Sequence, residues 1–198
     1  MAMTTRIHTD VIEDEAVTAA KLAATLDLSS KTLTLRGGWN YSAQTATTSG
    51  TSVELTTAIP SWATEIEVML SGVSTDAVNQ PALIQLGDAG GYETTSYVAS
   101  VAVIETTNCG ETNITAGFQT ARAGEYAAAD ELTGVVRLSR WDASEHLWLA
   151  HGVITASGSE IHFLSGSKTL SDALTSIQLT TPGGTAAFDA GEARVRYR

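Results

Sequence analysis

The chain is poor in cysteine and in long apolar runs, and each shortage removes a class of protein. Its single cysteine, Cys109, excludes an intrachain disulfide, so stability must come from packing and association. No apolar stretch approaches the length of a membrane-spanning helix, and the first residues lack the basic, apolar and small-residue order of a signal peptide. We therefore expect cytoplasmic synthesis without Sec-type export or membrane insertion.

Basic residues are also scarce. Lysine and arginine total 11 against 22 aspartates and glutamates, which gives a formal net charge of −11. Binding to the nucleic-acid backbone needs clustered lysine and arginine, so no nucleic-acid partner is predicted. Only 17% of the residues are charged, and Thr, Ser, Ala and Gly are abundant. A surface of hydroxyl groups and small side chains is typical of all-β extracellular or virion proteins.

The clearest structural pattern follows Pro60. Ile66, Val68 and Leu70 alternate with polar side chains, and this period of two predicts a half-buried strand that starts after a turn at the proline. Further strands are predicted at residues 53–58, 82–86, 97–104 (buried on both faces), 114–121, 132–140, 147–155, 160–164, 176–181 and 192–198. We predict a jelly-roll-like antiparallel β-sandwich of about nine or ten strands, without long helices.

Residues 1–40 have a different pattern. Their apolar spacing is too irregular for a coiled coil and predicts short helical turns followed by a short strand. A segment of this size cannot bury its apolar side chains alone. It must therefore pack either on the main domain or on copies of itself, and we favour the second alternative. The predicted oligomerisation residues are Ile12, Val17, Leu22 and Leu26. Residues 41–52, rich in Ser and Thr, are predicted to link this segment to the sandwich of residues 53–198.

Two parts of the chain resemble bacteriophage fibre proteins. Residues 12–22 (Ile-Glu-Asp-Glu-Ala-Val-Thr-Ala-Ala-Lys-Leu) and 26–35 (Leu-Asp-Leu-Ser-Ser-Lys-Thr-Leu-Thr-Leu) resemble tail-fibre shafts and attachment regions. The remainder resembles the C-terminal domain of such fibres at residues 59–62 (Ile-Pro-Ser-Trp), 68–75, 83–88, 91–95 and 188–191. The resemblance implies a homotrimer around a threefold axis, contact with other virion proteins through the N-terminal segment, and a place on the virion surface after assembly in the bacterial cytoplasm.

Enzymatic chemistry has little support in the sequence. There is no Gly-x-Ser-x-Gly elbow, and the four histidines have no spacing that implies a catalytic base. We expect no catalytic residues, cofactor or metal. Asp88 and Glu93 flank a glycine-rich loop that could hold calcium, but a tight hairpin explains the same glycines and is preferred. Cys109 is expected to be a small buried residue.

Binding of a host-surface glycan or protein is the better prediction, because sugars stack on aromatic rings and form hydrogen bonds with short polar groups in loops. Trp141 and Trp148 flank residues 142–147, which include His146, and these three residues are the first candidate site. Tyr92 with Glu93 is the second. The alternative for each ring is that it caps the sandwich or fills a subunit contact.

These observations favour a non-enzymatic virion fibre or spike that displays a β-sandwich for host attachment. Two alternatives remain open. A free carbohydrate-binding module or lectin predicts a stable monomer that binds sugar without residues 1–40, and a glycan depolymerase predicts loss of cleavage when one particular Asp or Glu is replaced.

Overall fold

The computed structural model describes residues 38–56, 58–104, 109–142, 144–157 and 160–198. The described chain is built from antiparallel strands, with one short 3-10 turn, η1 (Ala123–Glu125), as its helical element. The predicted oligomerisation residues Ile12, Val17, Leu22 and Leu26 lie outside the described residues. Among the described residues there is no helix long and apolar enough to span a membrane.

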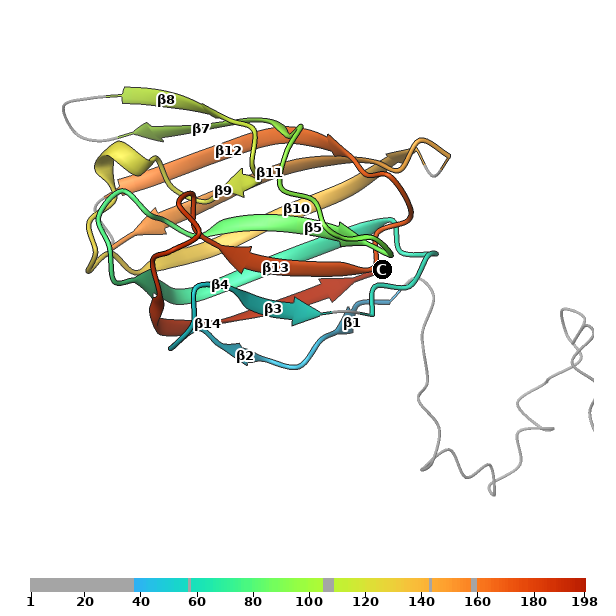
Figure 1. The fold of residues 1–198 in the computed structure, drawn as a ribbon, viewed down its shortest axis with the longest axis horizontal. Helices are drawn as coiled ribbons and strands as arrows, with labels where there is room; N and C mark the ends of the chain where they lie inside the picture. Colours follow the sequence, from blue (N-terminus) through green and yellow to red (C-terminus); the bar gives the residue numbers. More distant parts are fainter. Residues whose placement is uncertain (1–37, 57, 105–108, 143, 158–159) are drawn as a thin grey trace, which may run out of the picture. The chain divides into compact units, whose positions relative to one another are not determined.

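Two sheets form the predicted all-β sandwich (Figure 1). The larger, of nine strands, has the order β1-β14-β4-β10-β11-β12-β7-β8, with β2 also paired to β14. Its strands are β1 (Asn40–Tyr41), β2 (Thr45–Ala46), β4 (Glu65–Thr75), β7 (Val98–Ile104), β8 (Cys109–Ile114), β10 (Leu132–Asp142), β11 (Leu147–Ala156), β12 (Glu160–Thr169) and β14 (Phe188–Tyr197).

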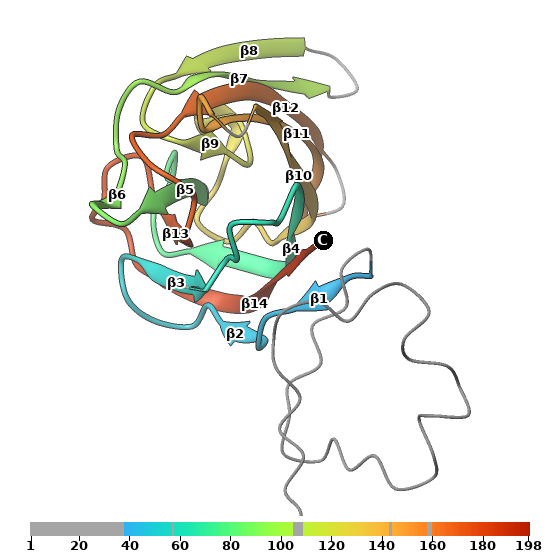
Figure 2. The same ribbon diagram turned by 90° about the vertical axis from the view of Figure 1, so that its right-hand side faces the viewer.

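The smaller sheet has five strands in the order β3-β13-β5-β6, with β9 paired to β5. These are β3 (Val53–Thr56), β5 (Leu83–Asp88), β6 (Gly91–Tyr92), β9 (Phe118–Gln119) and β13 (Ser176–Thr180). Figure 2 shows the larger sheet curving around this smaller one, so the core lies between them.

The alternation predicted from the sequence places side chains correctly in the long strands. Ile66 and Val68 of β4, and Val195 of β14, are fully buried, while their sequence neighbours face outward. The turn before β4 is closed by a hydrogen bond from the Ala63 N–H to the Pro60 carbonyl (2.9 Å). Each buried aliphatic side chain of this kind contributes about 1.5–3 kcal/mol relative to exposure, which explains why the pattern determines the fold.

Ten of the described strands have four residues or more, which matches the predicted number. The other four are two-residue strands, too short to give a periodic pattern. Two of them, β1 and β2, pair with β14 through Asn40–Tyr197 and Ala46–Glu192, so part of the predicted linker, residues 41–52, belongs to the larger sheet.

Two burial predictions were wrong. The strand at residues 97–104 was predicted to be buried on both faces, but Val98 and Ile104 of β7 are exposed on the face of the larger sheet that points away from the smaller one. Cys109 is exposed rather than buried, because it starts β8, the edge strand beside β7. An apolar run alone does not show whether a second layer covers the outer face of a sheet.

Candidate functional site

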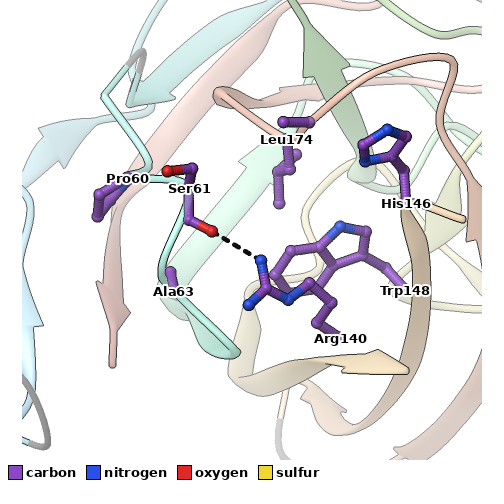
Figure 3. A pocket seen from close by; sticks show the side chains of 8 residues that line it. Pro60, Ser61, Ala63, Arg140, His146, Trp148 and Leu174 are labelled. Carbon is purple, nitrogen blue, oxygen red and sulfur yellow. Dashed lines mark hydrogen bonds between the residues drawn. The ribbon is translucent and has the colours of Figure 1, made fainter. Parts of the chain in front are cut away.

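An open cavity of about 160 Å³ lies between the turn at Pro60 and the β10–β11 hairpin (Figure 3). Its wall combines residues of the turn before β4, the β10–β11 hairpin and the loop between β12 and β13. The residues that line it are Pro60, Ser61, Ala63, Arg140, His146, Trp148, Ala173 and Leu174. Pockets for drug-sized ligands measure roughly 300–1,000 Å³, so this cavity fits one small ring or a terminal group of a larger molecule.

Trp148 provides the aromatic surface of the cavity. It is the second residue of β11 and pairs in register with Arg140 of β10, so both side chains project to the same side of the larger sheet. Trp148 is almost fully buried among core residues and lines the cavity. A ring held in this way is a rigid apolar wall of the cavity, and its small exposed area leaves no free face for a sugar to stack on.

His146 lies in the hairpin between β10 and β11, with its backbone in the left-handed region (φ 52°). Histidine tolerates this region better than most side chains do. The turn before it is fixed by Asp142, whose Oδ1 accepts hydrogen bonds from the Ser144 N–H (2.6 Å) and the Glu145 N–H (3.1 Å). The hydrogen bond from the Ser144 hydroxyl, with these two N–H groups, lowers the pKa of Asp142.

Arg140 closes the side of the cavity next to β4. Its Nη1 donates to the Ser61 carbonyl at 2.7 Å, which ties the end of β10 to the turn at Pro60 (Figure 3). Its backbone N–H donates to the Thr64 carbonyl at 2.9 Å. One guanidinium nitrogen is thus used to position the group, and the planar fork leaves further donors for a ligand oxygen.

The remaining wall is the loop of residues 170–175, which carries Ala173 and Leu174. The Leu170 N–H donates to the His146 carbonyl (3.2 Å), and the Ile59 N–H donates to the Thr175 carbonyl (2.9 Å). Backbone hydrogen bonds thus connect the three parts of the wall, so the cavity is preformed.

The charge of the cavity differs from that of the whole chain. Among the described residues that line it, Arg140 carries a positive charge, and none is an Asp or Glu. The chain has a net charge of −11. A ligand with a carboxylate or another anionic group therefore meets a locally favourable site on an acidic protein.

The two tryptophans that were predicted to form one binding platform have different environments. Trp148 is in the cavity wall, whereas Trp141 is 71% exposed and does not line the cavity. The structure thus brings together His146 and Trp148 from the predicted set and adds Arg140, Ser61 and Leu174. Arg140 ended a predicted strand, but its meeting with the turn at Pro60 depends on the β4–β10 pairing, which a single sequence does not reveal.

The second predicted pair, Tyr92 and Glu93, has structural partners. The Tyr92 hydroxyl donates to Glu54 at 2.9 Å, and burial together with this carboxylate raises the pKa of Tyr92 to about 12. Glu93 forms an ion pair with the buried Lys168 and accepts the Ser171 N–H at 2.7 Å. Burial acts to raise the pKa of Glu93, but the hydrogen bonds from Lys168 and Ser171 together with the charge of Lys168 outweigh it, and the pKa is lowered. The Ser171 contact holds the loop of residues 170–175, which forms one wall of the cavity.

Asp88 closes the predicted hairpin through its own side chain. Its Oδ1 accepts the Gly90 N–H at 2.8 Å, and its Oδ2 accepts the Ser171 hydroxyl at 2.7 Å and the Asp172 N–H at 3.0 Å. The Ser171 bond is the main reason that the pKa of Asp88 is lowered. Strands β5 and β6 pair through Asp88 and Gly91, so the tight hairpin is confirmed. In the described part of the chain no three His, Cys, Asp or Glu side chains group as metal ligands.

No protein-family model matches the chain, and neither a curated protein nor a solved structure matches it.

Proposed function

We propose that this protein is a non-enzymatic bacteriophage fibre or spike whose β-sandwich attaches the virion to a host-surface glycan through the cavity between Arg140, His146 and Trp148. One observation carries the binding role: a rigid aromatic ring and a guanidinium converge on a small preformed cavity at the loop end of the sandwich. Sugars are bound by apolar contact with aromatic rings and by hydrogen bonds to fixed polar groups; here Trp148 supplies a small apolar contact and Arg140 the hydrogen bonds.

The cavity favours a terminal sugar with an acidic group. Its volume of about 160 Å³ admits one ring, and Arg140 can donate two hydrogen bonds to a carboxylate. Such a shallow site binds weakly alone. The homotrimer implied by the resemblance to phage fibres presents three copies, and several fibres on one particle convert weak contacts into firm attachment by avidity. The N-terminal segment, residues 1–40, is the proposed contact with other virion proteins.

The same cavity also favours a second candidate, a free lectin or carbohydrate-binding module. The two functions differ in assembly, since a lectin predicts a monomer and a fibre predicts a trimer. A depolymerase is the weaker alternative, because hydrolysis by two opposed carboxylates needs acidic residues that the described cavity wall does not supply.

The binding role is tested with the full-length protein on an array of immobilised glycans that end in neutral sugars, uronic acids or sialic acids. We expect selective binding to acidic termini and a loss of about 10- to 100-fold in affinity for Arg140→Ala, the cost of a charge-assisted hydrogen bond. Arg122→Ala is the matched control, because Arg122 precedes η1 at the other end of the sandwich (Figure 1). Equal affinity of the Arg140 variant and the parent protein would contradict the assignment.

A further inference from the structure

A second cavity, of about 280 Å³, lies on the outer face of the larger sheet, the face that points away from the smaller sheet. It is found at the edge where β1 and β2 run beside β14 (Figure 2), and we call it the edge cavity. Its volume is close to the lower limit of roughly 300 Å³ for drug-sized ligands. The side chains that line it and that a ligand can contact are Tyr41, Gln44, Met69, Ser71, Glu192 and Arg194.

The strand register places four of these side chains in a square on two neighbouring strands. Ser71 of β4 pairs with Glu192 of β14, and Met69 of β4 pairs with Arg194 of β14. Directly paired residues project to the same side of a sheet, and so do residues two apart on one strand. Ser71, Glu192 and Arg194 are exposed, whereas the residues between them on each strand are buried, so the four side chains point outward.

Tyr41 and Gln44 complete the wall from the edge of the sheet. Tyr41 pairs in register with Arg196, so its ring lies on the outer side as well, and it is 48% exposed. The centre of the ring is 4.5 Å from the guanidinium carbon of Arg194. Gln44 donates a hydrogen bond from its side-chain amide to Glu192. An aromatic ring with this exposure offers apolar area to the C–H groups of a ligand.

The two charged side chains keep hydrogen-bonding capacity after these contacts. Arg194 donates from Nε to the Ser42 carbonyl at 2.9 Å, and Glu192 accepts the Gln44 bond at Oε2. Among the contacts between described residues, the terminal nitrogens of Arg194 and Oε1 of Glu192 are left for a ligand. The existing contacts hold both groups in place, so little side-chain entropy is lost on binding.

The charges at the edge cavity balance. Glu192 and Arg194 are two residues apart on one face of β14, about 6.8 Å along the strand. One carboxylate and one guanidinium leave the cavity without net charge, which gives no electrostatic advantage to an anion or a cation. A hydroxyl group both donates and accepts, so two neighbouring hydroxyls can bond to the carboxylate and to the guanidinium at once. Met69 and the Tyr41 ring supply apolar contact beside these groups.

We propose that the edge cavity is a binding site for a neutral sugar, whose neighbouring hydroxyls bridge Glu192 and Arg194 while the ring packs on Tyr41 and Met69. The edge cavity differs from the Arg140 cavity in its residues, in its place on the sandwich and in the charge of its ligand, so it goes beyond the proposed function. Two weak sites of different specificity on one copy increase the avidity of attachment to a mixed glycan surface.

The test is titration of the full-length protein with the methyl glycosides of glucose, galactose and mannose at millimolar concentrations, followed by NMR. We expect at least one of them to bind, and Glu192→Gln to weaken that binding about 10-fold or more, because a hydrogen bond to a charged group is lost. Ser71→Tyr is expected to abolish binding, since it fills the cavity from an exposed position. Glu111→Gln is the matched control with unchanged affinity, because Glu111 is exposed on β8 at the opposite edge of the same sheet.

Both substitutions are at exposed positions, so the variants are expected to fold, and circular dichroism with thermal melting verifies it. Arg140→Ala should keep the affinity for the neutral glycoside, and Glu192→Gln should keep any affinity for acidic glycans, which separates the edge cavity from the Arg140 cavity. Unchanged affinity in Glu192→Gln and Ser71→Tyr, or no binding of the three glycosides by the folded parent protein, would overturn the site. Tighter binding of methyl glucuronide, lost in Ser71→Tyr, would also overturn it, since the cavity would then prefer an anion.

Discussion

The Nδ1 atom of His162 accepts a hydrogen bond from the backbone N–H of Arg122 at 3.2 Å. His162 is fully buried on β12, and its Nε2 lies 3.2 Å from Oε2 of Glu160. Because Nδ1 accepts, the proton of the neutral ring is assigned to Nε2. A second proton on Nδ1 would point at the Arg122 N–H, so the folded geometry requires a neutral imidazole.

The stability of the protein is therefore expected to fall as the pH drops below 6.5. Burial lowers the pKa of His162, although the nearby carboxylates of Asp130 and Glu125 act to raise it. Unfolding lets the imidazole take up a proton at its ordinary value of 6.5, so acid favours the unfolded chain. The loss has an upper limit of about 1.4 kcal/mol for each pH unit below 6.5.

Urea unfolding of the parent protein and of His162→Gln at pH 7.5 and 5.5 measures this effect. The difference in free energy of unfolding between the two pH values should be larger for the parent protein, since the variant has lost the titrating group. Equal differences would show that His162 is not responsible.

Glu67 is the centre of an ion cluster on the outer side of β4. Burial acts to raise its pKa, but hydrogen bonds from Arg137 (2.6 Å) and Arg196 (2.6 Å) outweigh burial, and the pKa is lowered. Glu67→Gln should cost about 1–2 kcal/mol of unfolding free energy, less than the 3–5 of a fully buried pair because both arginines reach solvent.

Glu65→Gln is the control, because the Glu65–Arg198 pair on the same strand is more exposed. It should cost less than about 0.5 kcal/mol. If both substitutions changed the denaturant midpoint equally, the burial of Glu67 would add nothing to the contribution of its ion pairs to stability.

Gly191 of β14 lies directly against the backbone of Gly72 in β4. Its φ is +85°, and a Cβ placed there would lie 2.2 Å from the carbonyl oxygen of Gly72. We expect Gly191→Ala to destabilise the protein by about 3 kcal/mol or more, from backbone strain together with the clash. Gly184→Ala tests the strain alone, since Gly184 has φ +65° with no atom within 4 Å, and should cost about 1–2 kcal/mol. Thermal unfolding of both variants distinguishes the two contributions.

The sequence predicted the long strands well. It predicted poorly which face of each strand is buried and which is exposed. In β14, Ala193 and Val195 alternate with Glu192 and Arg194, and this pattern identifies the buried face because the outer side chains are charged. In β12, apolar residues occur on both faces, so His162 and Phe163 give no such signal. Where a face is apolar but uncovered within one copy, hydrophobic patterning cannot separate a core residue from an interface residue.

The candidate cavity was predictable in part for a related reason. His146 and Trp148 lie in one hairpin, and turn chemistry around Asp142 marks that hairpin in the sequence. Arg140 and Leu174 reach the same cavity only through long-range pairing of β10 with β4 and the return of the chain after β12. Such contacts follow from topology, which local propensity does not determine.

Substitution of Lys168 tests whether Tyr92 and Glu93, the second predicted binding site, have a structural role instead. The Lys168 side chain is almost completely buried, forms an ion pair with Glu93, donates to the Thr95 carbonyl at 2.9 Å and lies 5.0 Å from the centre of the Tyr97 ring. Lys168→Met should cost about 2–4 kcal/mol, because Glu93 keeps its charge next to an apolar side chain. Adding Glu93→Gln should recover part of that loss, since the unpaired carboxylate is then gone. Urea unfolding of the two single variants and the double variant gives this coupling energy. A double variant no more stable than Lys168→Met would contradict the assignment of the Lys168–Glu93 pair as a structural contact.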